Sequence, residues 1–205
     1  MNNPPQSGAP PGSAWRPRQL ELLAGIEAIF FARGYRAVTM DDLAAELHCS
    51  KRALYEIASS RRALFLLIVG RWSERIRILG QAGAEQEQDP KARLEAFLAP
   101  GVTQTVGLTE NFLTDIQSLP AARALLDKHQ RERMDMLRTI VEDGIREGRF
   151  AALHAHLVAG VCLAGITRIN DPIFLREAGL TFHTAFAELY RLLMWGLQAI
   201  QSDDA

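Results

Sequence analysis

Cysteine is scarce in this chain, with only Cys49 and Cys162 among 205 residues. Because these two lie far apart in the sequence, we predict neither a paired zinc or redox motif nor the disulfide framework of a small secreted protein. Long apolar runs are also missing, since charged residues interrupt them before the roughly 20 residues that a membrane-spanning helix needs. We therefore expect a cytoplasmic protein with no membrane span.

Aromatic residues make up only 7% of the chain, and the net charge is -1. A charge so close to zero argues against a protein that binds nucleic acid over its whole surface. The stretch of residues 1–14 has no charge at all, and it carries four prolines and two glycines. It lacks the charged start and the apolar stretch of a signal peptide, so we expect a disordered arm there.

Helical spacing of apolar residues is the strongest pattern that is present. Leu22, Ile26, Ile29 and Phe30 predict one helix over about 19–33, which Gly34 ends. No stretch alternates as a strand would, so we predict an all-α fold. Further helices are expected from a cap at residue 59 or 60 to about 80, and over about 91–99, 110–117, 120–147, 152–168 and 180–198.

Two short helices are predicted between residues 39 and 57, separated by a tight turn. Thr39 and Ser50 suit the caps of these helices, and Asp42 completes a capping box with Thr39. This arrangement predicts a helix-turn-helix, a motif that places its second helix in the major groove of DNA. The side chains that it offers to DNA are Thr39, Ser50, Lys51, Arg52 and Tyr55. Two short helices with a Lys-Arg pair also occur in many helical proteins that do not bind DNA, so that alternative stays open.

A longer pattern extends over residues 18–65 and contains Ile26-x-x-Ile29-Phe30-x-x-Arg33-Gly34-Tyr35, Thr39-x-x-x-Leu43-Ala44, Ser50-Lys51-x-x-Leu54-Tyr55 and Leu64. It resembles the N-terminal signature of the TetR family, whose members are dimeric, all-helical transcriptional regulators and mostly repressors. The resemblance implies a three-helix DNA-binding domain over residues 15–62 and a C-terminal helical domain for ligand binding and dimerisation over residues 63–205. It also implies that Ile57 and Arg61 contact DNA. Leu47-His48 stands where the family usually has a small residue and glycine. Histidine tolerates the left-handed conformation better than most residues, though at a cost, so we expect a less regular turn.

Two apolar helices near the C-terminal end need partners. The segment 151–166 is almost wholly apolar, and the last predicted helix carries an apolar stripe. A symmetric pair of these helices with their copies would form a four-helix interface, which predicts a homodimer on a palindromic operator with recognition helices about 34 to 36 Å apart. The expected interface residues are Leu157, Val161, Gly165, Phe182, Phe186, Leu189, Leu193 and Leu197.

The resemblance further implies a small-molecule pocket between the C-terminal helices. The residues on those helices are apolar, so we expect a hydrophobic or aromatic effector whose acidic group, if it has one, meets Arg138 or Arg168. The pocket residues that we predict are Trp72, Ile76, Phe97, Phe112, Met134, Leu137, Arg138 and Cys162.

Signs of catalysis are missing from the sequence. There is no nucleophile with a base, no phosphate loop and no metal set, because His154 and His156 are two positions apart on a predicted helix and face different ways. We therefore predict no enzyme, cofactor or metal. The alternative to a regulator is an all-helical small-molecule-binding or scaffold protein whose DNA-binding function is degenerate, motivated by Leu47-His48, Glu56 and Ala58.

Overall fold

The structure, a computed structural model, describes residues 15–198. The predicted arm over residues 1–14 and the last residues, 199–205, lie outside the described residues. The described part is all-α, as predicted, and its only strand-like pairing is an isolated bridge between Phe150 and Gln198. Its helices are α1 (Pro17–Arg33), α2 (Met40–Glu46), α3 (Lys51–Ile57), α4 (Arg61–Glu85), α5 (Pro90–Thr103), α6 (Glu110–Ser118), α7 (Pro120–Arg146), α8 (Ala155–Ile169), α9 (Pro172–Ala178) and α10 (Phe182–Gly196).

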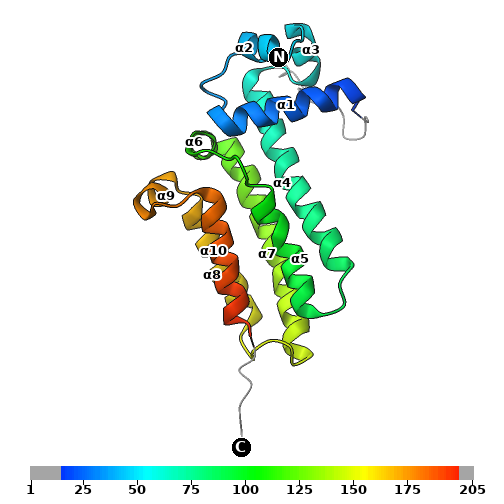
Figure 1. Ribbon diagram of the computed structural model, residues 1–205, viewed down its shortest axis with the longest axis vertical. Helices are drawn as coiled ribbons and strands as arrows, with labels where there is room; N and C mark the ends of the chain where they lie inside the picture. The colour runs from blue at the N-terminus through cyan, green and yellow to red at the C-terminus, as the bar shows by residue number, and fades with distance from the viewer. Residues whose placement is uncertain (1–14, 199–205) are drawn as a thin grey trace, which may run out of the picture.

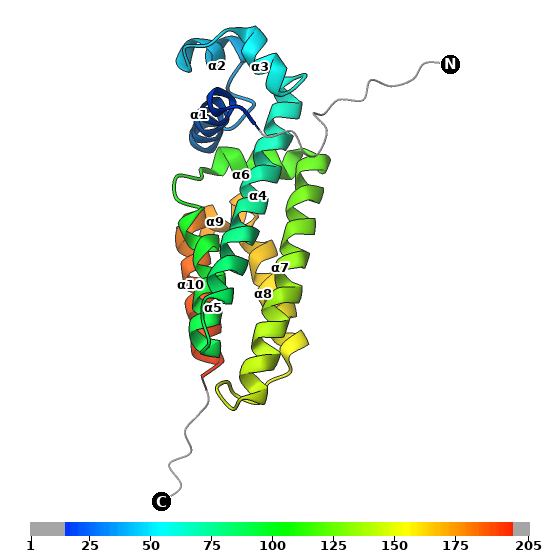
Figure 2. The same cartoon turned by 90° about the vertical axis from the view of Figure 1, so that its right-hand side faces the viewer.

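The helices are arranged as a small head on a long bundle. Figure 1 shows α1, α2 and α3 gathered at one end of the molecule around the first turns of α4, which continues into the bundle. The bundle consists of α4, α5, α7, α8 and α10, in which α4 packs on α5 and α7, and α8 packs on α7 and α10. Figure 2 shows α6 between the head and the bundle, where it contacts both α1 and α7.

Side-chain caps set the starts of the head helices where the sequence predicts them. The Thr39 hydroxyl accepts a hydrogen bond from the Asp42 amide at 3.1 Å, and Asp42 accepts one from the Thr39 amide at 2.8 Å. These bonds lower the pKa of Asp42. Ser50 caps α3 and Ser60 caps α4, each through a bond of 3.1 Å to a backbone amide three residues later.

An aromatic cluster joins the head to the bundle. Phe31 of α1, Phe65 and Trp72 of α4, and Phe112 of α6 meet edge to face, with ring centroids 4.8 Å apart for Phe31 and Phe112. The predicted domain boundary between residues 62 and 63 falls in the first turn of α4, so the core is continuous across it. The division into two domains stays a prediction.

Three details differ from the predicted helices. The first is α5, which continues through Pro100 to Thr103, because a proline removes one donor without always ending a helix. The second is α9, which the apolar spacing missed, although Asp171 caps it, Pro172 begins it and Gly179 closes it at φ +66°. The third is α8, which begins at Ala155 rather than at residue 152.

Candidate DNA-binding and effector sites

The turn between α2 and α3 has the geometry that a helix-turn-helix requires. His48 has a φ of +47° at the position where the family usually has glycine, and it is the one residue other than glycine with a positive φ in residues 15–198. The Cys49 amide donates to the Ala44 carbonyl at 2.9 Å, which closes the end of α2. Leu43 of α2 and Leu54 of α3 are fully buried, so the two short helices share one core.

The predicted DNA-contacting side chains on α3 lie on its outer surface. Ser50, Lys51 and Arg52 are exposed, as is Thr39 at the start of α2. Tyr55 is 51% exposed, which is unusual for an aromatic residue and leaves its hydroxyl free to meet a phosphate. The structure therefore brings these five side chains to the accessible surface of the head.

Acidic neighbours pair with the cations of this surface. Lys51 forms an ion pair with Asp41, whose hydrogen bond and charge raise the pKa of Lys51. Glu56 contacts Arg52 at 3.4 Å and Arg16 at 3.3 Å. Exposed pairs such as these contribute only about 0 to 1 kcal/mol each, so a phosphate or a base can replace the acidic partner at little cost.

Two residues that the resemblance assigned to DNA contact other parts of the head. Ile57 is 6% exposed because it lies three positions after Leu54, on the inward face of α3. Arg61 is partly exposed, donates from Nη1 to the Val38 carbonyl at 2.6 Å and stacks 5.5 Å from the centre of the Tyr35 ring. These contacts of Arg61 fasten the segment between α1 and α2, and DNA contact by Ile57 and Arg61 stays a prediction.

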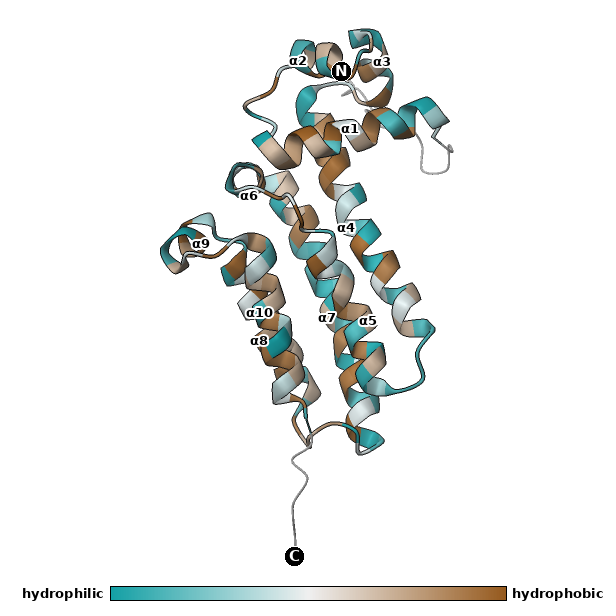
Figure 3. Cartoon of the chain, in the orientation of Figure 1, coloured by the Kyte–Doolittle hydropathy of each residue, from teal (hydrophilic) through white to brown (hydrophobic). Residues whose placement is uncertain are grey.

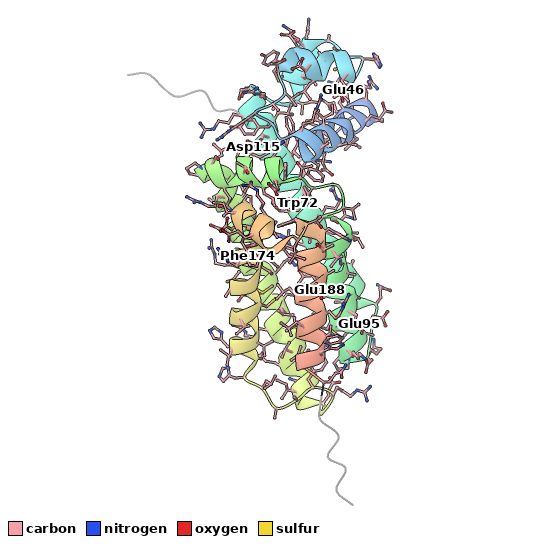
Figure 4. The ribbon with its side chains drawn as sticks, turned by 60° about the vertical axis from the view of Figure 1, so that its left-hand side comes forward. Glu46, Trp72, Glu95, Asp115, Phe174 and Glu188 are labelled. Carbon is pink, nitrogen blue, oxygen red and sulfur yellow. The ribbon has the colours of Figure 1, made fainter. Side chains whose placement is uncertain are left out.

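A buried cavity of about 30 Å³ lies between α4, α5, α7, α8 and α10. Three of the predicted pocket residues line it, namely Trp72, Ile76 and Met134. Figure 4 shows Trp72 where α4 enters the bundle, and its indole Nε1 donates to the Gln104 carbonyl at 2.8 Å.

The other predicted pocket residues lie elsewhere. Phe112 belongs to the aromatic cluster, and Phe97 and Leu137 are fully buried without lining the cavity. Cys162 lines a groove on the outer face of α8 and α10. Arg138 faces outward from α7 and contacts Glu142 at 3.6 Å, so it does not point into the bundle.

Five polar residues that were not among the predicted pocket residues line this cavity. They are Thr105, His129, Gln130, Arg133 and Tyr190, and each is at most 8% exposed. The spacing of Leu126, His129, Gln130, Arg133 and Leu137 places all of them on one face of α7. This spacing was the signal in the sequence, because it assigns polar side chains to the inward face of a core helix.

Burial keeps the titratable groups around the cavity uncharged. It lowers the pKa of His129 to about 3, with the positive charges of Arg133 and Arg77 adding to the effect. It raises the pKa of Tyr190 to about 12, against the opposing charge of Arg133. Outside the cavity wall, burial also raises the pKa of Cys162 to about 11. At neutral pH, Arg133 is thus the charged group that lines the cavity.

The outer face of α8 and α10 is apolar and open. Hydrophobic residues recur along both helices (Figure 3), and between them lies an apolar groove of about 310 Å³. Leu157 and Val161 are 65% and 62% exposed, in line with their predicted place on an interface. Leu192 and Trp195 are equally exposed and extend this surface, although the sequence analysis did not include them.

The remaining predicted interface residues divide between two faces. Phe182, Phe186 and Leu197 are buried in the chain's own core, because the inward face of α10 follows positions 182, 186, 190 and 197. These three have little surface left for a partner, although Leu197 also lines the groove, and their place in an interface stays a prediction. Leu189, Leu193 and Gly165 are partly covered, with Leu189 packed against Gly165 so closely that a Cβ there would lie 2.9 Å away.

Residues 22–68 match the family model described as bacterial regulatory proteins, tetR family. The matched segment contains α2, α3 and the turn between them. The amino-terminal domain belongs to the TetR family. No curated protein sequence matches the chain.

Solved structures of TetR-family regulators share the fold over nearly the whole chain. A regulator from Agrobacterium tumefaciens is 17% identical, with a TM-score of 0.68 over 89% of this chain and 98% of that one. A putative regulator from Saccharomonospora viridis, crystallised with choline, is 16% identical, with a TM-score of 0.70 over 88% and 97%. Reduced NemR from E. coli is 17% identical, with a TM-score of 0.67 over 90% and 99%. The chain thus has the fold of a TetR-family transcriptional regulator.

Metal-binding clusters and membrane-spanning helices are absent from the described range. Across residues 15–198 no three His, Cys, Asp or Glu side chains come together as a metal site would require. No single helix in that range is long and apolar enough to cross a membrane. Helices α8 and α9 taken together have the length and composition of a membrane span, but they meet at a bend of 85°.

Proposed function

We propose that this chain is a homodimeric transcriptional regulator, a repressor that a small hydrophobic or aromatic effector releases from a palindromic operator. The observation that carries the proposal is the exposed group of Ser50, Lys51, Arg52 and Tyr55 on a TetR-family recognition helix. A regulator also needs a second site in the same chain, and the cavity in the helical bundle supplies the candidate.

Side-chain chemistry indicates which of these residues would contact bases and which would contact phosphates. Arg52 carries the planar fork that reads guanine in the major groove, and Lys51 is a point charge for a phosphate or a base. Thr39, Ser50 and Tyr55 offer hydroxyl groups to the backbone phosphates, which position the protein without reading sequence.

Dimerisation is supported by the apolar surface of α8 and α10. Leu157, Val161, Leu192 and Trp195 are each more than 60% exposed, and the first three line a continuous groove. Monomeric proteins rarely expose apolar patches of this kind, and a two-fold axis would place each patch against its own copy. Gly160 has open space around it, so the backbones of two α8 helices can approach closely there.

Two connections would carry an effector's influence from the bundle to the head. Helix α4 runs without a break from Ser60 in the head to Trp72 at the cavity. On α6, the buried Asp115 accepts a hydrogen bond from the Arg36 amide at 3.2 Å and pairs with the Arg36 guanidinium at 3.3 Å. Figure 4 shows Asp115 directly beneath the head. An effector that binds one arrangement of these helices more tightly would shift the spacing of the recognition helices.

The test is a fluorescence-anisotropy titration of the full chain against DNA from the region flanking its own coding sequence. The double variant Lys51→Ala, Arg52→Ala should lose roughly tenfold or more in affinity for DNA. Its affinity should also depend less steeply on salt, because a protein that makes fewer phosphate contacts releases fewer counterions from the DNA. The matched control is Lys128→Ala, Arg131→Ala on α7, which removes the same charge from exposed positions far from the head. Wild-type affinity in the α3 double variant would rule out this recognition surface.

A second candidate function is a small-molecule-binding protein without specific DNA binding. The pairing of Lys51 with Asp41 and of Glu56 with both Arg16 and Arg52 favours it, since acids neutralise the very cations that DNA needs. It predicts ligand binding by the full chain together with equal, salt-sensitive affinity for operator and random DNA. The substitution Glu56→Gln separates the two functions, because it should strengthen specific binding by a regulator.

A further inference from the structure

Arg133 is a buried cation without a carboxylate partner among residues 15–198. Its side chain is 4% exposed, its Nη2 donates to the Phe97 carbonyl at 3.0 Å, and its guanidinium stacks 4.7 Å from the centre of the Phe97 ring. The acids nearest to it on α7 pair with other residues, as Glu132 does with Lys128 and Asp135 with Arg138. A buried charge in this state is costly unless an anion compensates it.

Two further hydrogen-bond donors line the cavity beside Arg133. Gln130 and Tyr190 are each 6% exposed. The Tyr190 hydroxyl lies against Gly101, where a Cβ would come within 2.6 Å of it. A cavity wall with an amide, a phenol and a guanidinium is suited to a ligand that accepts hydrogen bonds.

The rest of the cavity wall is apolar. Trp72, Ile76, Met134, Phe182 and Phe186 enclose the space opposite the polar groups. The volume of about 30 Å³ holds about two water molecules, so a larger ligand has to move the surrounding helices apart. A ligand that must open the bundle binds the open and closed arrangements unequally, which is what an effector requires.

We propose that this cavity binds a small organic carboxylate, whose anionic head pairs with Arg133 and accepts hydrogen bonds from Tyr190 and Gln130. Its apolar body contacts Trp72 and Phe186. This inference rests on the proposed function, because the carboxylate would be the effector. Arg133 takes the place of Arg138 as the residue that meets the acidic group of the effector.

The binding test uses isothermal calorimetry on the full chain with four probes: benzoate and hexanoate, and their uncharged amides, benzamide and hexanamide. Each pair has nearly the same shape and differs in charge, so the comparison isolates the contribution of Arg133. We expect a carboxylate to bind at least about tenfold more tightly than its amide, as charge-assisted bonds are stronger than neutral ones. Amides that bind as tightly as the carboxylates or more tightly, or no heat from either carboxylate, would overturn the proposal.

Variants of the chain then assign the effect to a residue. Arg133→Met should abolish the preference for the carboxylate, whereas Arg133→Lys should retain part of it. Arg138→Met on the outer face of the same helix is the matched control and should bind as the wild type does. If Arg133→Met does not fold, Tyr190→Phe decides, because loss of one hydroxyl donor should weaken carboxylate binding about fivefold. Unchanged binding in both Arg133→Lys and Tyr190→Phe would contradict the proposal.

The carboxylate site and the proposed regulatory function can fail independently of each other. If the chain binds its operator and neutral compounds release it while carboxylates do not, the carboxylate site is wrong and the regulator stands. If the chain binds carboxylates through Arg133 but no DNA specifically, the site stands and the regulator is wrong.

Discussion

Arg133 and Arg138 are five positions apart on one helix and have opposite environments. Arg133 points into the bundle, where it contacts Phe97, whereas Arg138 lies on the outer face beside Asp135 and Glu142. Five positions correspond to about one and two fifths of a helical turn, so the two side chains leave the helix in different directions. A residue's charge therefore says little about its role until its face is known.

His129 faces the same cavity, and it makes stability depend on pH. Its pKa falls from 6.5 to about 3 on folding, because burial disfavours the charged imidazole and Arg133 and Arg77 repel it. The unfolded chain therefore binds more protons between pH 3 and pH 6.5, so stability is full above pH 6.5 and is lost as the pH falls. Between pH 7 and pH 5 this group should lower the free energy of unfolding by about 2 kcal/mol.

Urea unfolding at pH 7 and pH 5, followed by circular dichroism, measures that loss. In His129→Gln the difference between the two pH values should be smaller by about this amount. The control is His154→Gln, which alters an exposed histidine and should leave the pH dependence unchanged. An equal loss in the wild type and in His129→Gln would show that other groups cause the acid sensitivity.

At the scale of elements, the head helices are specified by nearby residues. Thr39, Ser50 and Ser60 cap their helices through bonds to amides three positions later, and such bonds depend on no distant part of the chain. The turn at His48 is equally local, although histidine adopts its φ of +47° at a cost. Helix α9 has only seven residues and one buried side chain, Leu175, so it is too short to show an apolar repeat in the sequence.

The strain in this turn gives a test at the element scale. His48→Gly should raise the free energy of unfolding by up to about 1 kcal/mol, because glycine reaches the left-handed region without a Cβ clash. Ala45→Gly, one turn earlier in α2, is the control, and it should lower the stability by about 1 kcal/mol since glycine disfavours a helix interior. Thermal unfolding measures the stability of both variants relative to the wild type. A destabilised His48→Gly would mean that the imidazole contributes contacts that outweigh the strain.

For the whole molecule, the open question is which surfaces meet a second copy. The outer face of α8 and α10 exposes Leu157, Val161, Leu192 and Trp195, while the acids and bases of α7 cover the opposite side with ion pairs. An apolar face of this kind would be covered in a dimer, and a dimer would present two recognition helices to one operator.

Introducing charge on this face should therefore break the assembly. Leu157→Glu, Val161→Glu is expected to give a monomer by light scattering after size exclusion and to weaken operator binding roughly tenfold or more, because the two half-sites no longer act together. Ile78→Glu, Leu79→Glu is the matched control, since both residues are exposed and apolar but lie on α4, which packs on α5 and α7. A wild-type dimer in the α8 variant would place the interface elsewhere.

The sequence by itself determined the head of this protein. The spacing of Leu22, Ile26 and Phe30, the caps at Thr39 and Ser50, and the turn at His48 all act over a few residues, so they can be recognised before any fold is known. The exposed cations of α3 were predicted for the same reason.

Only the tertiary structure decided which polar residues face inward and which apolar residues remain outside. Arg133 and Tyr190 meet at one cavity although they are far apart in the chain, and Phe182 is covered while Trp195 is not. The sequences of α8 and α10 do not determine which of their faces is buried, because a helix that is apolar on several sides can bury any of them. The packing of neighbouring helices determines which face is buried. Burial then shifts the pKa values of the groups that line the cavity and so determines which of them are charged.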